Sequence, residues 1–189
     1  PTSALLALAP LVAFGLIDPD TIIVDAKSGV TGAGRKLAEG FLFSEANEDF
    51  KAYKVNTHQH APEINQELSK LARKKLAVIF VPHLLPLDRG ILSTAYVRKS
   101  RKAKERKQDF VELYKNFYKD EPFVRVRNEN EFPRIKDVAR TNICDIGIKE
   151  EAESVIVISA IDNLLKGASG QAVQNMNIMC KFPEKTALC

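Results

Sequence analysis

Six runs of apolar, largely β-branched residues recur along the chain, and they constrain its fold more than any other feature. Their lengths and compositions are typical of strands rather than helices. They cover residues 21–26, 76–86, 90–97, 123–127, 143–148 and 154–161. Segments with helical spacing precede, separate and follow them. This order predicts an α+β domain with helices on one face of a mixed, mostly antiparallel sheet.

The first two elements have clear local signals. The opening segment is apolar on most helical faces, which indicates a buried helix that Thr2 or Ser3 caps and that continues to about Leu16. Residues 21–26, TIIVDA, are rich in β-branched residues and are expected to form a strand buried on both faces.

The later runs predict how the sheet continues. Residues 90–97 are expected to form a hairpin with 76–86. Residues 123–127, FVRVR, alternate apolar and basic side chains, as an antiparallel strand with one wet face would. A helix is expected over 108–120, and the last helix over 162–179. No repeat or linker divides the chain, so we expect one domain over 1–189.

Composition excludes several classes of protein. The net charge of +4 is too small to indicate nucleic-acid binding but suits a small anionic substrate. No apolar run approaches the roughly 20 residues of a membrane span. The basic run 98–107 lacks interleaved aromatic residues and is expected to be the solvated entry to a helix. Three scattered cysteines indicate thiols in a reducing compartment, hence a cytoplasmic protein, or an organellar one in a eukaryote.

The most glycine-dense segment, residues 28–36 (SGVTGAGRK), directly follows the first predicted strand. Glycines let the backbone approach a ligand, exposed N–H groups favour anions, and Arg35 can grip a carboxylate or phosphate. The spacing matches neither GxGxxG nor the P-loop. The segment predicts an anion-binding loop, with a glycine-rich turn and a solvated Arg35 as the alternative.

Two of the three histidines, His58 and His60, stand two residues apart in a segment, 51–60, that is expected to be extended. Residues two apart in an extended segment share a face, so both imidazoles would line one cleft. Glu63 opens the helix predicted from Pro62 to Lys75. The pattern favours acid/base chemistry. The alternatives are a metal site completed by Glu63 or His83, although no common zinc spacing is present, and ordinary histidines without a function.

Two further segments carry candidate polar residues. His83 has apolar neighbours and is expected to be a hydrogen-bonded structural residue. Arg89, beside a glycine, either reaches an anion or pairs with Asp88. Asn163, near the start of the last predicted helix, offers an amide to a ligand, while the small residues of 167–172 favour close packing against another backbone.

Six motifs together carry a specific resemblance. In order, they are PTSALLAL, DAKSGVTGAGRK, HQHAPEI, PHLLPLDRGI, NICDIG and IDNLLKGASGQAVQNMNIM. Over nearly its whole length, the chain thereby resembles the C-terminal two-thirds of N-acetyl-gamma-glutamyl-phosphate reductases.

The resemblance implies a reaction in which NADPH reduces an acyl phosphate to an aldehyde through a thioester and a thiohemiacetal on a cysteine. The implied fold resembles glyceraldehyde-3-phosphate dehydrogenase, in which a Rossmann domain precedes an α+β catalytic and dimerisation domain. The helix over 162–179 would pack on the Rossmann domain. The resemblance also implies NADP as cofactor, a small anionic acyl phosphate as substrate, and a homo-oligomer, dimer or tetramer.

The resemblance further implies roles for single residues. His58 resembles the catalytic general acid/base, and His60 and Glu63 resemble residues that line the substrate pocket. The role of Arg35 as an anion clamp is our inference from its charge and place.

On the glycine-rich loop, Ser28 and Gly29 resemble residues near the substrate and the nicotinamide. Asn163 resembles the residue that contacts the nicotinamide end of the cofactor. These three positions are therefore the expected meeting point of the substrate and the cofactor.

The sequence departs from the family pattern at its nucleophile. The family carries its cysteine in a GCYPT sequence, and this chain opens at the Pro-Thr, so the cysteine would lie two residues before Pro1. None of Cys144, Cys180 and Cys189 stands in a comparable context, and the Rossmann GxGxxG is absent from this sequence. We therefore expect this polypeptide alone neither to turn over substrate nor to hold NADPH firmly.

Two other readings stay open. One is a sister reductase of lysine biosynthesis, which acts on an aminoadipyl phosphate linked to an acidic carrier protein and for which the basic run 98–107 would provide a contact. The other is a non-catalytic homologue with a structural or dimerising role, although the retained HxH and glycine loop argue against it.

Overall fold

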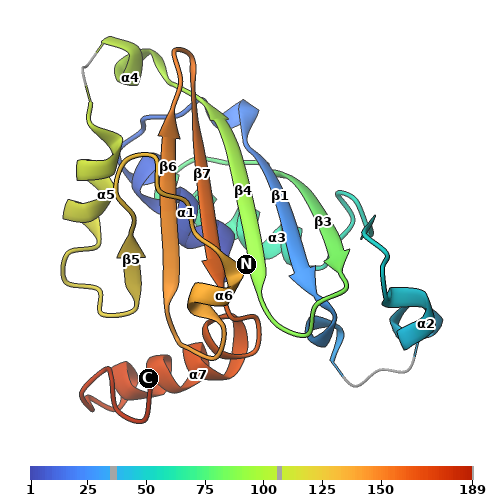
Figure 1. Cartoon of the computed structure of the whole chain (residues 1–189). Coiled ribbons are helices and arrows are strands. Elements are labelled where there is room, and N and C mark those ends of the chain that lie inside the picture. Colours follow the sequence, from blue (N-terminus) through green and yellow to red (C-terminus); the bar gives the residue numbers. More distant parts are fainter. Residues whose placement is uncertain (35–37, 106–107, 189) are drawn as a thin grey trace.

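The computed structural model describes residues 1–34, 38–105 and 108–188, and these residues form one seven-stranded sheet (Figure 1). The strands are β1 (Ile23–Gly29), β2 (Lys51–Ala52), β3 (Ile79–Leu85), β4 (Ile91–Arg98), β5 (Val124–Val126), β6 (Cys144–Glu150) and β7 (Ser154–Ile161). Their order is β2-β3-β1-β4-β7-β6-β5. Neighbours are antiparallel except for β1 with β3 and β5 with β6. The expected mixed, mostly antiparallel sheet is confirmed.

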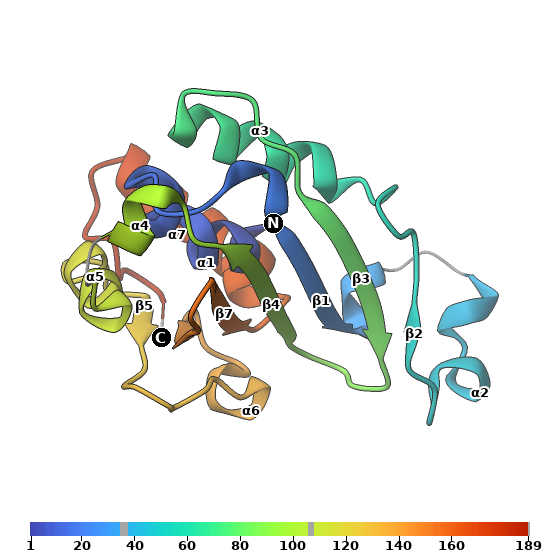
Figure 2. The same cartoon turned by 90° about the horizontal axis from the view of Figure 1, so that it is seen from above.

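Helices cover mainly one face of this sheet. Figure 2 shows the longer helices α1, α3 and α5 on one side and the one-turn helix α6 on the other. The helices are α1 (Thr2–Ala13), α2 (Phe43–Ala46), α3 (His60–Ala72), α4 (Arg101–Glu105), α5 (Phe110–Phe117), α6 (Ile135–Val138) and α7 (Gly170–Met179). Short 3₁₀ turns span Pro19–Thr21, Val30–Ala33 and Glu39–Phe41, and a π-helical turn spans Leu165–Ser169.

Helix α1 is the centre of the core, as its apolar sequence predicts. Leu8 and Leu11 are fully buried against the sheet and the neighbouring helices. The Tyr114 hydroxyl of α5 donates to the Ala7 carbonyl at 2.5 Å, which attaches α5 to α1 without leaving a buried polar group unpaired. The core therefore holds α1 between the sheet and its flanking helices.

The first turn of α1 is attached to the sheet by buried hydroxyls. The Ser3 and Ser93 Oγ atoms lie 2.7 Å apart, and the Ser159 hydroxyl donates to the Ser3 carbonyl at 3.0 Å. Pro1 occupies the N-cap position and no side chain caps the helix. The expected cap by Thr2 or Ser3 is therefore wrong, because the Ser3 hydroxyl bonds across to β4 instead.

Strand β1 is buried on one face only, so the expectation of burial on both faces is wrong for the single chain. Val24 and Ala26 point to the helices and are buried. Ile23, which is 38% exposed, Asp25 and Lys27 point to the opposite face, which the helices leave largely open. Because side chains alternate along a strand, one uncovered face exposes every second residue.

Strands β3 and β4 are consecutive in the sequence but do not pair, so the predicted hairpin is wrong. Strand β1 lies between them, parallel to β3 and antiparallel to β4. The connection from β3 to β4 crosses the end of β1, where the carbonyls of Leu87 and Asp88 accept N–H bonds from Val30 and Thr31 at 2.8 and 3.3 Å. In a two-strand hairpin, the backbone groups of the connection would bond to each other. Here the carbonyls of the connection accept from the glycine-rich loop instead.

Strand β5 is parallel to β6, not antiparallel as its alternation predicted. The chain after β5 crosses the open face of the sheet over Gly147. A Cβ at Gly147 would lie 2.8 Å from both the Glu131 carbonyl oxygen and the Pro133 ring. This crossing returns the chain to the end of the sheet where β5 began, so β6 runs in the same direction.

The last helix begins later than predicted, at Gly170. Asp162 and Asn163 precede it, and the π-helical turn separates them from α7. The Asp162 carboxylate accepts the N–H groups of Leu164 and Leu165, which starts a tight turn in place of a regular helix. Among the described residues, no helix combines the length and the apolar character needed to cross a bilayer.

Candidate active site

The predicted histidine pair lies at the start of α3, beside the first residue of α1. The Glu63 carboxylate, in the first turn of α3, interacts with the amine of Pro1. Burial lowers the pKa of that amine, and the charge of Glu63 raises it in part. The charge of the same amine also acts on His58 and His60. The structure thus gathers the N-terminus of α1 and these three predicted site residues into one place.

The geometry that joins the two histidines differs from the predicted one. Residues 53–59 form a turn in which Lys54 and Asn56 have positive φ, and only Lys51 and Ala52 are in a strand. The backbone N–H of His60 donates to Nδ1 of His58 at 3.1 Å, and the ring centroids lie 4.7 Å apart. The pairing was predicted correctly, but a helix start rather than an extended segment produces it.

Both imidazoles are held in the neutral state. Burial, followed by the charges of Lys54 and the Pro1 amine, lowers the pKa of His58. Burial, the Pro1 amine and His58 lower the pKa of His60 to about 4. The His58 ring also lies edge-on to Tyr53 and Phe80, with centroids 5.6 Å away in each case. Both imidazoles are therefore mainly neutral at neutral pH, and a neutral imidazole offers one nitrogen as a donor and the other as an acceptor.

The glycine-rich loop packs tightly against the connection between β3 and β4. A Cβ at Gly29 would lie 2.7 and 2.8 Å from the carbonyl oxygens of Leu87 and Asp88, so any larger residue would displace the backbone. The hydroxyl of Ser28 donates to the Gly29 carbonyl at 3.2 Å, and a Cβ at Gly32 would meet that hydroxyl at 3.2 Å. The glycines therefore allow close packing against the β3–β4 connection, whereas the sequence prediction was a close approach to a ligand.

Asn163 joins this loop from the turn after β7. Its Oδ1 accepts the N–H of Gly90 at 2.7 Å, and its Nδ2 donates to the Thr31 hydroxyl at 2.8 Å. The residue is 6% exposed. Ser28, Gly29 and Asn163 are thus brought together at one end of the sheet.

The residue before it, Asp162, is a fully buried carboxylate that sequence reasoning did not single out. It accepts the N–H groups of Arg140, Leu164 and Leu165 and an Arg89 guanidinium nitrogen at 3.2 Å. Burial alone would raise its pKa, but these donors outweigh burial and lower it. Arg89 therefore pairs with Asp162, and not with Asp88 as one of the alternatives held.

Other candidates lie outside this site. Arg35, predicted as an anion clamp, lies outside the described residues. His83 points to the open face of the sheet, opposite the histidine pair, with its Nδ1 3.0 Å from Asp25 Oδ1. Neither of these two atoms has a hydrogen-bond partner among the described residues, so the expected hydrogen bond of His83 is not present at Nδ1. Because of its position, His83 cannot join His58 at a metal.

No metal site is present among the described residues, and their buried cysteine, Cys144, is not suited to act as a nucleophile. Among them, no group of three or more His, Cys, Asp or Glu side chains is placed to hold a metal ion. Cys144 is fully buried in β6, and burial raises the pKa of its thiol to about 12, a state without nucleophilic character.

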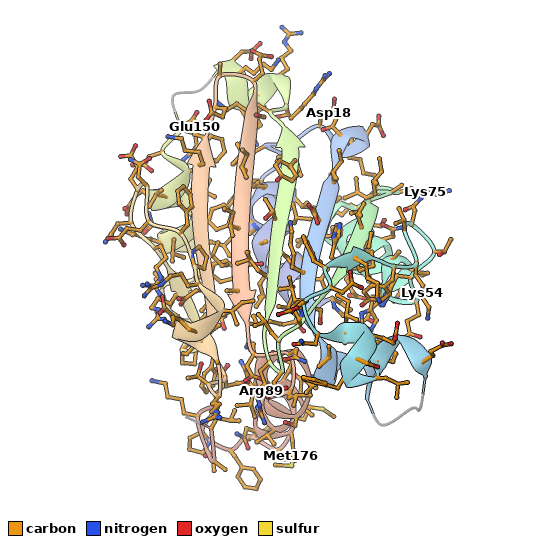
Figure 3. The ribbon with its side chains drawn as sticks, turned by 45° about the vertical axis from the view of Figure 1, so that its right-hand side comes forward. Asp18, Lys54, Lys75, Arg89, Glu150 and Met176 are labelled. Carbon is orange, nitrogen blue, oxygen red and sulfur yellow. The ribbon has the colours of Figure 1, made fainter. Side chains whose placement is uncertain are left out.

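The basic run is remote from this site. The Lys102 ammonium donates to the Phe14 carbonyl at 2.8 Å and the Ser100 hydroxyl to the Gly15 carbonyl at 2.9 Å, so α4 lies at the C-terminal end of α1. The 12 residues of α1 separate the two ends by about 18 Å. In Figure 3, Asp18 and Glu150 mark one end of the sheet, and Arg89 of the β3–β4 connection lies at the other.

Residues 1–163 match the family model described as "Semialdehyde dehydrogenase, dimerisation domain". The chain belongs to the semialdehyde dehydrogenase family. Similar proteins include N-acetyl-gamma-glutamyl-phosphate reductases of Pelotomaculum thermopropionicum (57% identical), Staphylococcus saprophyticus (49%) and Geotalea daltonii (53%). Each alignment covers 100% of this chain but only 54–55% of the relative, so the chain spans about half their length. The resemblance stated from the motifs is confirmed.

Solved semialdehyde dehydrogenase structures share the fold at low identity. Aspartate semialdehyde dehydrogenase II of Vibrio cholerae superposes with a TM-score of 0.71 at 15% identity, over 95% of this chain and 59% of that one. A probable aspartate-semialdehyde dehydrogenase of Pseudomonas aeruginosa gives 0.68 at 16% identity, over 95% and 61%. The expected fold class is therefore confirmed, and the described residues form this one sheet without a Rossmann domain.

Besides Asp162, two further site residues of this family member were not found by sequence reasoning. Thr31 lay within the predicted loop without a role of its own, and Tyr53 precedes the histidine pair by five residues. Neither has a spacing that points to chemistry. Thr31 is recognisable only through its hydrogen bond to Asn163, which is 132 residues away in the sequence.

Proposed function

We propose that this chain is the catalytic and dimerisation domain of an NADPH-dependent N-acetyl-gamma-glutamyl-phosphate reductase of arginine biosynthesis, with the cytoplasm as its expected compartment. The proposal rests on the names of relatives that are about half identical to it over its whole length. The choice of NADP over NAD rests on the resemblance alone, because the residues that would read the cofactor phosphate belong to a Rossmann domain.

One structural observation carries the proposal. His58, His60 and Glu63 converge on Pro1 at the start of α1, and the family motif locates its cysteine two residues before that proline. A thiol at this position would lie beside the histidine pair and near the positive end of the α1 dipole. Both features favour the thiolate that attacks an acyl phosphate.

His58 is the residue arranged to move a proton. Its Nδ1 accepts the His60 N–H, so the neutral ring carries its proton on Nε2. A bound NADPH supplies the hydride. In this neutral form the Nε2–H group donates a hydrogen bond to the substrate oxygen on which negative charge develops. To transfer a proton, the ring first takes one up from solvent and becomes an imidazolium, and giving the Nε2 proton to that oxygen then returns the ring to the neutral form.

The glycine loop is assigned to the anionic substrate. Ser28 provides a hydroxyl, and Gly29 and Gly32 let the loop pack closely against the β3–β4 connection and Asn163, which holds that hydroxyl in place. His60 and Glu63 are assigned to the wall of the substrate pocket, and Asn163 to the nicotinamide end of the cofactor. Arg35 remains the proposed clamp for a phosphate or carboxylate of the substrate.

Two surfaces are assigned to partners. Ile178 and Met179 on α7 are 56% and 82% exposed, and we assign this apolar helix surface to contact with the Rossmann domain. The open face of the sheet is assigned to a second copy of the chain, in a dimer or in a tetramer built from dimers, in keeping with the family's description as a dimerisation domain.

The carrier-linked reductase is the weaker candidate. An acidic carrier would dock beside the substrate entrance, whereas the basic run lies at the far end of α1 from the histidine pair. A non-catalytic homologue is also weaker, since a site without chemistry has no need to keep His58, His60, Ser28 and Asn163 in place.

The test is to read the coding sequence upstream of Pro1, express the extended protein, and measure phosphate-dependent reduction of NADP⁺ by N-acetylglutamate 5-semialdehyde. We expect a Cys-Tyr directly before Pro1 and an activity that a Cys→Ser substitution abolishes. The 189-residue chain, assayed alongside, should be inactive. An extended protein that has no such cysteine and no activity would favour the non-catalytic homologue.

A further inference from the structure

We propose that Thr31 is a positioning residue that couples the glycine loop to Asn163. The inference rests on the proposed function, which assigns the loop to the substrate and Asn163 to the nicotinamide end of the cofactor. The Thr31 hydroxyl would thus link the loop that binds the substrate to Asn163, the residue that contacts the nicotinamide.

The hydroxyl of Thr31 is engaged on both sides. It donates to the Asp88 carbonyl and accepts the Nδ2–H of Asn163 at 2.8 Å. Since Asn163 Oδ1 accepts the Gly90 N–H at 2.7 Å, each end of the amide has its own partner. The plane of the amide is thereby fixed, with the oxygen directed to the β3–β4 connection and the nitrogen to the glycine loop.

The loop itself does not depend on this hydroxyl for its attachment. The backbone N–H groups of Val30 and Thr31 already donate to the carbonyls of Leu87 and Asp88. The additional effect of the hydroxyl is the link to Asn163. An amide nitrogen has two hydrogens, and within the described residues only one has a partner. The link thus determines where the second hydrogen points, which is the one left for a ligand.

The chain contains a matched control at the other end of the same strand. Thr21 precedes β1, and its hydroxyl also donates to a backbone carbonyl, that of Asp18 at 2.9 Å, while it accepts the Arg98 N–H at 3.1 Å. The substitution Thr21→Val therefore removes an equivalent bridging hydroxyl far from Asn163. Thr31→Val removes the link with almost no change in volume, and Thr31→Ser retains the hydroxyl.

The first measurement uses the 189-residue chain and needs no activity. The side-chain amide signals of Asn163 are assigned by NMR from their loss in Asn163→Ala. Thr31→Val should shift these signals and speed their exchange with water, whereas Thr31→Ser and Thr21→Val should leave them in place. Unchanged Asn163 signals in a folded Thr31→Val chain would overturn the proposal.

The second measurement uses the extended protein in a double-mutant cycle. Thr31→Val should lower kcat/KM roughly 3- to 10-fold, the effect of one hydrogen bond, and Thr31→Ser should restore it. Combined with Asn163→Ala, it should add no further loss, because the partner is already gone. Fully additive losses, or an equal loss in Thr21→Val, would overturn the coupling. An inactive parent protein would instead refute the proposed function, and the NMR result would still decide the link.

Discussion

The backbone N–H of His60 donates to Nδ1 of His58 at 3.1 Å, so that one histidine begins the helix that carries the other. This bond has two consequences. It takes the place of the Ser, Thr, Asp or Asn cap found at most helix starts. It also leaves Nε2 as the only nitrogen of His58 that can exchange a proton with a substrate.

The substitution His58→Asn separates these two roles. The Asn side-chain oxygen can accept the same N–H, so the start of α3 should persist, while the titrating nitrogen is lost. In the extended protein we expect kcat to fall roughly 10²-fold or more, with an unfolding temperature close to that of the parent. His83→Asn, on the opposite face of the sheet, is the matched control and should keep its rate. An unchanged rate in His58→Asn would remove the assignment as general acid/base.

The low pKa of His60 predicts a pH dependence of stability. Burial, the Pro1 amine and His58 hold the pKa at about 4 in the folded chain, against 6.5 for an ordinary histidine. Between these two values the unfolded chain binds more protons, so the free energy of unfolding rises with pH. The contribution should be complete above pH 6.5 and lost as the pH falls toward 4.

Urea unfolding of the 189-residue chain between pH 4 and 7.5 measures this contribution. The Pro1 amine also has a lowered pKa and adds its own slope, so the comparison must be with His60→Gln, which removes only the imidazole. We expect the variant to have a shallower pH dependence than the parent chain. Parallel curves for the two proteins would show that His60 titrates normally.

The tight packing of the glycine loop predicts a large effect of one methyl group. Gly29→Ala would push a Cβ to within 2.8 Å of two carbonyl oxygens, both of them backbone atoms that cannot move aside alone. We expect destabilisation of about 1–3 kcal/mol by thermal or urea unfolding, with loss of the Asn163 amide environment seen by NMR. At Gly40, where a Cβ meets nothing within 4 Å, Ala should be neutral. Equal effects at both positions would contradict the close packing.

The elements themselves were largely predictable from local sequence. Residues 154–161 form β7 as expected, and β6 begins one residue later than predicted. Such runs are recognisable because β-branched side chains fit the pleated, half-buried surface of a strand. The capping residue Asp109 and the amphipathic pattern likewise place α5 within its predicted range.

The order of the strands was not predictable in the same way. Nothing in 76–97 reveals that β1 lies between β3 and β4, because the bonds that secure it join residues 57 positions apart, Thr31 and Asp88. The site residues divide in the same way, into those with a local sequence signal and those without one. The short spacing of His58 and His60 identified them, whereas Thr31 and Asp162 act through partners far along the chain.

The open face of the sheet gives the last prediction. Four apolar side chains form one row across four neighbouring strands: Ile79, Ile23, Tyr96 and Ile156. Ile79 and Tyr96 are 50% and 42% exposed in the single chain. Rows of this kind on an uncovered sheet face favour association with a second surface.

If this face binds a second copy, a charge in the middle of the row should prevent association. Ile23→Lys would bury an ammonium without a partner in the dimer, yet leave it in solvent in the monomer. We expect light scattering after size-exclusion chromatography to give twice the chain mass for the parent and the single-chain mass for the variant. Leu71→Lys is the control, since Leu71 is 41% exposed on α3, away from this face, and should remain dimeric. A variant at Ile23 that still dimerises would move the interface to another surface.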